Sequence, residues 1–412
     1  MTVRRTAWLV LVSAVARAPG FIIPIIVGAM FGAGLLTDAY FVAYGAVLLV
    51  AGTVGQAIEV AIVPFAAGAL ASGSGRGFFD RKAGKVAAIV GGLWLVVVAL
   101  LYLVTGELKE LVLEFCLAFL PLALAWGAAA VYSGGLISLG RIGAATGSSL
   151  LRGAGGLIGL ALAPAGGGLW AVALGLGAGE IARLAWLRWT LFRSPVEPGH
   201  SVAMTLPPSF QMAASSMVIA SGVGTLIPMI EKVLATGLGP GAISHLEYAI
   251  RLLMVPAVLF DGALGPLLLS RLAREQAVAG TPPTLAMARR AVLSGAAIAV
   301  GAAAAVALLA PMVVGLVLST GEFSAVDETT VVDLLRILAI GFAATMTALL
   351  IERIYVAAGR NRQLAVLMLP RAGLRLVTAI ILLPTMGLMA FAIGYGVGET
   401  CYLGLLLWRV PR

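Results

Sequence analysis

The sequence predicts an all-α integral membrane protein with about twelve transmembrane helices in two six-helix lobes. Three observations support this fold class. Hydrophobic residues make up 61% of the 412 residues and charged residues 11%, and the mean hydropathy is +1.07. Long apolar runs recur from end to end, and similar segments occur half a chain apart. A water-soluble domain of this composition would lack a polar surface, so soluble classes are excluded.

Apolar windows of about 20 residues locate the predicted helices. In the first half they lie near residues 6–31, 39–70, 84–105, 110–138, 143–165 and 167–190, and in the second near 208–236, 242–271, 287–318, 329–358, 362–384 and 386–408. The predicted N-terminal lobe therefore covers 1–190 and the C-terminal lobe 208–412. The basic, polar stretch 191–207 is predicted to be a cytoplasmic linker.

The distribution of basic residues predicts the orientation in the membrane. With a cytoplasmic N-terminus, the inner loops hold most of the loop arginines and lysines, including Arg76, Arg81 and Lys82, whereas the outer loops hold only Lys109. This asymmetry follows the positive-inside rule and explains the net charge of +9 without nucleic-acid binding. The apolar run after MTVRR is interpreted as an uncleaved first span. Both termini are predicted to be cytoplasmic.

Two segments of similar design indicate an internal repeat. Ile23-Pro24 in the first half has a counterpart in Ile227-Pro228 in the second, and an arginine within an apolar run accompanies each segment, Arg17 and Arg251. Transporters built from repeats place the substrate cavity between them. Because each predicted half has an even number of spans, the halves should share one orientation and be related by an axis along the membrane normal.

The sequence contains no pattern typical of an enzyme. Gly84-Lys85 lacks the flanking residues of a phosphate loop, and the two histidines, His200 and His245, lie far apart. Cys116 and Cys401 lie in apolar spans and suggest neither a disulfide framework nor a metal site. No catalytic residue, metal site or cofactor is predicted.

Ionisable residues at membrane depth are the candidate functional residues. Arginines suit bidentate binding of phosphate, and four of them are predicted to bind an anionic substrate headgroup: Arg17, Arg251, Arg371 and Arg375. In the alternative, acids pair with these arginines and hold the protein together. The supporting acids are Asp38, Glu59, Glu247, Asp261 and Glu399. Glu180 and Arg183, three residues apart, are predicted to form a local pair near the cytosolic edge.

Several of these segments resemble the MurJ/MviN family of lipid II flippases in the multidrug/oligosaccharidyl-lipid/polysaccharide exporter superfamily. The matching pieces are Arg17-x-x-Gly20-Phe21, FGAGLLTDAYFVA at 31–43, Pro64, YAIRLLMVP at 248–256 with the following ALGPLLLSRLA, and TGEFSAVD at 320–327. The resemblance implies a central headgroup cavity to which Arg17 and Arg251 contribute. It also places family arginines at Ile23 and near Val50, where this chain has apolar residues, and an acid at Ile250. The family's two further C-terminal helices have no counterpart among the twelve predicted spans.

The resemblance therefore implies an alternating-access flippase of a polyprenyl-diphosphate-linked saccharide, either lipid II or a polysaccharide repeat unit, used in cell-envelope biogenesis. Its partners would be the lipid-linked saccharide and membrane lipids. Two alternatives remain from the sequence. One is an exporter of drugs or other small molecules from the same superfamily. The other is a transport-inactive scaffold that binds envelope-synthesis enzymes.

Overall fold

The computed structural model describes residues 15–16, 18–71, 75–194, 210–257, 285–319, 322–358 and 360–410. Within these ranges the regular secondary structure is helical, and no strand occurs. Helices of this kind satisfy their own backbone hydrogen bonds, which an apolar membrane interior requires. The predicted fold class is confirmed. The chain divides into two compact units, one of residues 1–23 and 35–237 and the other of residues 24–34 and 238–412.

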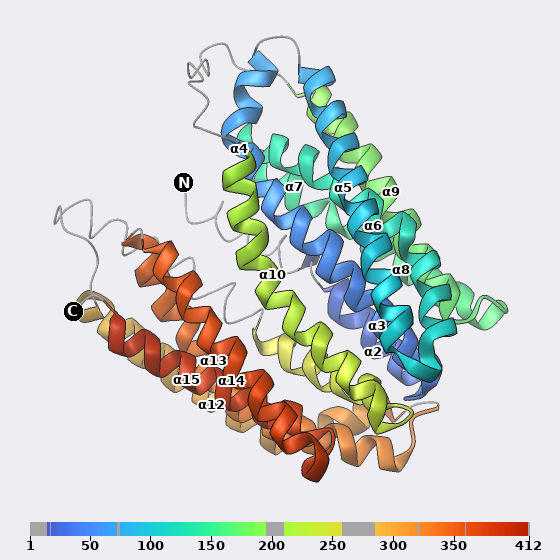
Figure 1. Cartoon of the computed structure of the whole chain (residues 1–412), viewed down its shortest axis with the longest axis vertical. Helices are drawn as coiled ribbons and strands as arrows, with labels where there is room; N and C mark the ends of the chain where they lie inside the picture. Colours follow the sequence, from blue (N-terminus) through green and yellow to red (C-terminus); the bar gives the residue numbers. More distant parts are fainter. Residues whose placement is uncertain are drawn as a thin grey trace. The chain divides into compact units, whose positions relative to one another are not determined.

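The first unit contains most of the helices coloured blue to green in Figure 1. They are the start of α2 (Pro19–Phe31), α3 (Leu35–Val47), α4 (Thr53–Ala71), α5 (Gly75–Val104), α6 (Lys109–Ser138), α7 (Ile142–Gly147), α8 (Ser149–Leu162), α9 (Gly168–Phe192) and α10 (Phe210–Ala235). A π-helical turn over Leu48–Gly52 joins α3 to α4. This turn keeps 35–71 helical without interruption, over a range close to the predicted span 39–70.

Helix α6 forms the centre of the first unit and packs against α3, α4, α5 and α9. Its buried Phe115 stacks on Trp170 with ring centroids 3.9 Å apart, and Tyr40 of α3 lies 5.3 Å from Phe119. Aromatic pairs at these distances add specific contacts to the general burial of apolar surface. Helix α9 also packs against α8, and these two helices carry the charged residues described below.

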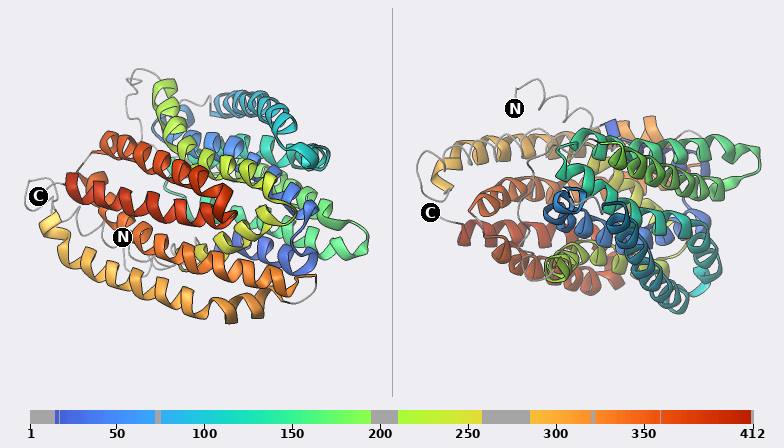
Figure 2. Two further views of the ribbon diagram at one scale, coloured as in Figure 1. Left: turned by 60° about the horizontal axis from the view of Figure 1, so that its bottom comes forward. Right: turned by 90° about the horizontal axis from the view of Figure 1, so that it is seen from above.

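The second unit contains a helical segment over 242–257, α12 (Leu285–Leu318), α13 (Ala325–Ala357), α14 (Asn361–Met386) and α15 (Met389–Arg409). Figure 2 shows α12 to α15, in orange and red, running side by side. Helix α13 packs between α12 and α15, and α15 packs on α14. Residues 24–34, which are most of α2 and the turn that follows it, also belong to this unit. The predicted lobe boundaries, with a linker over 191–207, stay a prediction.

Eight helices in the described part of the chain are long and apolar enough to cross a membrane. They cover 35–63, 76–104, 106–138, 168–192, 288–318, 325–356, 363–386 and 389–409, and each corresponds to a predicted span. Large apolar side chains on α5 and α12 are exposed, for example Leu103 at 78% and Leu308 at 79%. Exposed leucines on such helices are the surface that lipid tails cover.

The predicted span 143–165 differs from the structure. A turn at Ser148 separates α7 from α8, so the apolar run forms two shorter helices. The Ser148 hydroxyl donates to the carbonyl oxygen of Ala145 at 2.6 Å and accepts from Arg183 Nε at 2.9 Å. A hydroxyl that bonds the backbone locally competes with regular helix geometry. The break is therefore tied to a charged residue of the next helix.

Candidate functional site

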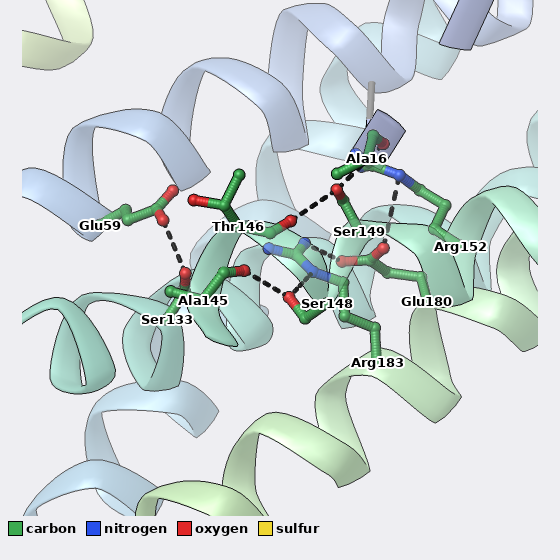
Figure 3. A network of polar contacts seen from close by, with 10 residues as sticks. All are labelled: Ala16, Glu59, Ser133, Ala145, Thr146, Ser148, Ser149, Arg152, Glu180 and Arg183. Carbon is green, nitrogen blue, oxygen red and sulfur yellow. Dashed lines mark hydrogen bonds and ion pairs between the residues drawn. The ribbon is translucent and has the colours of Figure 1, made fainter. Parts of the chain in front are cut away.

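A buried charged cluster lies within the first unit, where α8 meets α9 (Figure 3). Glu180 is fully buried and accepts a hydrogen bond from Arg183 Nη1 at 2.7 Å. Arg152 of α8 approaches the other carboxylate oxygen, with Nε 3.6 Å from Oε2. The predicted pair of Glu180 and Arg183 is confirmed. Glu180 stands halfway along α9, twelve residues from either end (180 − 168 and 192 − 180), rather than near the helix end.

The two arginines of this cluster differ in how firmly they are held. Arg183 has a close bond to Glu180 and a second bond to Ser148. Arg152 has only the longer contact to Glu180, and its guanidinium carbon lies 3.9 Å from the ring centroid of Trp126 on α6. Arg152 Nη1 and Glu180 Oε2 are shielded from solvent and make no hydrogen bond with any described residue. Because the cluster has two arginines and one glutamate, its net charge is positive.

The face of α8 that carries Arg152 packs on Ala16 and on the start of α2. The Ser149 hydroxyl contacts the carbonyl oxygen of Ala16 at 3.2 Å, and a Cβ on Gly156 would lie 2.6 Å from Cδ1 of Ile23. Only a glycine at position 156 permits so close a contact. The cluster is therefore next to the chain segment in which Arg17 follows Ala16. Arg17 itself and Asp261 lie outside the described residues.

The second unit holds a cluster of the same kind between α14 and α15. Arg371 Nε and Nη2 lie 2.8 and 2.6 Å from Glu399 Oε1, and the Glu399 side chain is 1% exposed. Tyr402, one turn after Glu399, donates to Glu352 Oε1 at 2.9 Å and lies beneath the Arg371 guanidinium at 4.9 Å. The fourth predicted arginine, Arg375, lies 5.2 Å from the ring of Tyr395. The predicted partner of Arg371, an acid on a neighbouring helix, is thus Glu399.

The two clusters occupy equivalent positions in a repeat. Arg152 precedes Glu180 by 28 residues and Arg371 precedes Glu399 by 28 residues, and each glutamate ends a matching motif, GLGAGE at 175–180 and GYGVGE at 394–399. A Cβ on Gly179 would lie 2.5 Å from the carbonyl oxygen of Leu151, and one on Gly398 would lie 2.9 Å from that of Arg371. Both glycines let the arginine helix approach its partner. The equal spacing and the shared motif were visible in the sequence, but Arg152 was not among the predicted site residues.

The other predicted residues lie in three separate places. Arg251 Nη2 lies 3.1 Å from Glu247 Oε2 on the same helix of the second unit. In the first unit, Glu59 accepts from the Ser133 hydroxyl at 2.6 Å, as Figure 3 shows. Asp38 is buried in the first turn of α3. The structure therefore brings together Arg371, Arg375 and Glu399 as one group and Arg251 with Glu247 as another.

The segments that resemble the flippase family meet one another within the second unit. The Tyr248 hydroxyl donates to the carbonyl oxygen of Gly32 at 2.8 Å, and Phe323 packs on the Tyr248 ring at 5.8 Å. His245 Nε2 lies 2.7 Å from Asp327 Oδ1, and Asp327 forms a capping box with Ser324 at the start of α13. These contacts link the end of α2, the helix over 242–257 and the start of α13, so the matching residues Gly32, Tyr248, Phe323 and Asp327 have a structural role there.

The sequence matches the family model described as "Lipid II flippase MurJ" over residues 27–412. Among solved structures, a lipid II flippase MurJ in an inward closed conformation is similar with a TM-score of 0.81 and 17% identity, and the match covers 98% of this chain and 87% of that one. None of the proteins with curated descriptions matches the sequence.

Transporters of the multidrug resistance MATE family are also similar. An inward-facing member of the MOP superfamily has a TM-score of 0.75 at 17% identity, with 95% of this chain and 93% of that chain covered. A MOP superfamily transporter from Pyrococcus furiosus, described with a binding pocket of reverse polarity, has a TM-score of 0.66 at 15% identity, with 98% of this chain and 94% of that chain covered. At these identities the structural likeness shows the fold alone.

Proposed function

Because the chain belongs to the MurJ family of lipid II flippases, we propose that buried arginines bind the diphosphate of its lipid-linked substrate while the protein moves that substrate across the bacterial inner membrane by alternating access. Membership makes the chain a multi-pass membrane transporter of a lipid-linked saccharide. The proposal adds three points to this membership. They are the residues that bind the headgroup, the identity of the membrane, and the orientation of the chain in that membrane. Its headgroup-binding residues are Arg17, Arg251, Arg371 and Arg375.

The single observation that carries the proposal is the presence of partly exposed guanidinium groups inside transmembrane helices. Arg371 lies ten residues into the 26-residue α14, and its side chain is 28% exposed although Glu399 is buried beside it. The Arg251 side chain is 16% exposed. A charged group in a membrane-spanning helix is costly unless it has a functional or structural partner. A guanidinium has five N–H donors, so one that binds a carboxylate still has donors for phosphate oxygens.

The proposed orientation is supported by the charges at one end of the first unit. Arg76, at the start of α5, and Arg188, near the end of α9, both lie over the Phe192 ring, at 5.5 and 5.4 Å. Arg188 also forms a bidentate pair with Asp80 at 2.9 and 3.0 Å. The basic residues of two predicted inner loops thus lie at the same end of the bundle. The positive-inside rule makes this end cytoplasmic.

Binding to the purified protein tests the proposal. Native mass spectrometry would compare lipid II and undecaprenyl-diphosphate-linked oligosaccharides with wild type, Arg17→Ala and Arg251→Ala, and with Arg188→Gln as a matched arginine control outside the proposed site. Selective binding that both alanine variants weaken and Arg188→Gln does not would support the proposal. Absence of binding, or binding that no variant changes, would contradict it and favour the small-molecule exporter or a scaffold for envelope-synthesis enzymes.

A further inference from the structure

The charged cluster of the first unit contains an arginine that the four proposed headgroup-binding residues do not include. We infer that Arg152, supported by the ring of Trp126, is a further binding site for the diphosphate of the lipid-linked saccharide. This inference rests on the proposed function, because it takes the ligand from it. It assigns the headgroup a contact on α8, within the first unit.

The cluster of the first unit has an excess of positive charge. Arg152 and Arg183 share one glutamate, and no other described carboxylate forms an ion pair with either arginine. A positive charge left over beside the middle of α9 is unfavourable without an anion. Arg152 Nη1 and Glu180 Oε2 are both buried without a hydrogen bond, which is a further cost. A phosphate oxygen would satisfy the N–H group and balance the charge.

Arg152 can bind a ligand without leaving the buried Glu180 carboxylate unpaired. Arg183 holds Glu180 at 2.7 Å, whereas Arg152 is 3.6 Å from it. If Arg152 turns toward a diphosphate, Glu180 keeps its close partner. The Arg152 side chain is 22% exposed, against 8% for Arg183, so only Arg152 has an accessible edge. The Trp126 ring at 3.9 Å supports the flat face of the guanidinium and leaves its edge for bidentate hydrogen bonds (Figure 3 shows Arg152 beside Glu180).

The arginine, the glycine motif and the buried glutamate of this cluster recur in the second unit. Arg152 has the same place before its GxGxGE motif as Arg371, with the same 28-residue separation from the buried glutamate. Both arginines also lie over an aromatic ring. The arginine, the glycine motif and the glutamate thus occur twice at one spacing, unlike an isolated structural ion pair, while the aromatic ring comes from α6 in the first unit and from α15 in the second. The residue before Arg17, Ala16, contacts α8 through Ser149, so the inferred site adjoins a segment that the proposed function already uses.

The test measures binding of undecaprenyl diphosphate and of uncharged undecaprenol to the full chain in nanodiscs. We expect Arg152→Gln to raise the Kd for the diphosphate by about 10- to 100-fold, the loss of one or two charge-assisted hydrogen bonds. Binding of undecaprenol should not change. Arg188→Gln, in the same unit but paired with exposed Asp80, is the matched control and should bind both ligands like wild type.

A second measurement on wild type avoids any effect of the substitution on folding. Phenylglyoxal modifies accessible arginines, and mass spectrometry gives the extent at each position. Undecaprenyl diphosphate should protect Arg152 several-fold and leave Arg188 unchanged. Protection by inorganic diphosphate, with none by the lipid at equal concentration, would overturn the inference in favour of a free anion.

The two proposals fail in different ways. If wild type binds undecaprenyl diphosphate but Arg152 is neither protected nor needed for affinity, the inference is wrong and the proposed function stands. An equal loss of undecaprenol binding in Arg152→Gln would also overturn the inference, because the arginine would then act through the fold. If wild type binds no polyprenyl diphosphate, the proposed function itself fails and the inference fails with it.

Discussion

The two arginine–glutamate clusters have the same spacing of arginine, glycine motif and glutamate, but the glutamate forms its close ion pair with a different residue in each. In the first unit, Glu180 binds closely to Arg183, one turn later on its own helix, and only loosely to Arg152 on α8. In the second unit, the residue one turn after Glu399 is Tyr402, and Glu399 binds closely to Arg371 on α14. A single difference on the glutamate helix therefore accompanies the change from a close ion pair within one helix to a close ion pair between two helices.

The aromatic contacts of the two clusters also differ. Tyr402 supports Arg371 from beneath and at the same time donates its hydroxyl to Glu352, so it joins α15 to α13. Trp126 supports Arg152 from α6, and Arg183 bonds to Ser148 at the turn before α8. The cluster in the second unit is thus anchored to a third helix by a hydroxyl, whereas the one in the first unit is anchored by a second arginine.

The largest expected effect comes from removing the buried glutamates. Glu180→Ala leaves two arginines without their carboxylate, and we expect a loss of stability of about 3–5 kcal/mol. Glu399→Ala should cost less, because Arg371 is 28% exposed and its charge can be hydrated. Thermal unfolding in detergent, followed by tryptophan fluorescence, measures both. Equal losses would mean that exposure of the arginine does not matter.

A smaller effect is expected from the glycines that precede the two glutamates. Gly179→Ala forces a Cβ to 2.5 Å from the carbonyl oxygen of Leu151, and should cost about 1–3 kcal/mol through separation of α8 from α9. Gly398→Ala meets the carbonyl oxygen of Arg371 at 2.9 Å and should cost less. The same unfolding measurement ranks the two variants. Gly404→Ala on α15, where nothing lies within 4 Å of the new Cβ, is the control.

The smallest effect is expected at the exposed pair of the first unit. Asp80 and Arg188 are 40% and 52% exposed, and ion pairs of this kind contribute less than about 1 kcal/mol. Asp80→Asn should therefore shift the unfolding temperature little and less in high salt than in low salt. A loss as large as that of Glu180→Ala would show that burial does not distinguish the two pairs.

Much of the fold could be predicted because its causes are local. Composition and the length of the apolar runs predicted the helices, and all eight long described spans lie where these runs lie. The break at Ser148 was not predicted, because it depends on a bond to Arg183, 35 residues away in the sequence. The pairs Glu180–Arg183 and Glu247–Arg251 were predictable, since residues three or four apart on one helix face each other.

The pairing across helices was only partly predictable. Arg371 was expected to need an anion, either an acid on a neighbouring helix or a ligand, and its pairing with Glu399 depends on how α14 and α15 are rotated against each other. Arg152 lies in an apolar span like the other candidate residues but was not among the four arginines predicted to bind the headgroup, because its neighbours Trp126 and Glu180 come from other helices. Ile23, where the resemblance placed an arginine, is 3% exposed and lies against Gly156 of α8.

The sequence by itself determined that this protein is a polytopic helical membrane protein, because hydropathy and the length of the apolar runs are properties of the chain. It also determined the family, through the segments at 31–43 and 248–256. Only the tertiary structure decided which arginine each buried glutamate holds. Residues 28 positions apart meet only when glycines let two helices approach within contact of their backbones, and a longer or shorter approach would pair them differently.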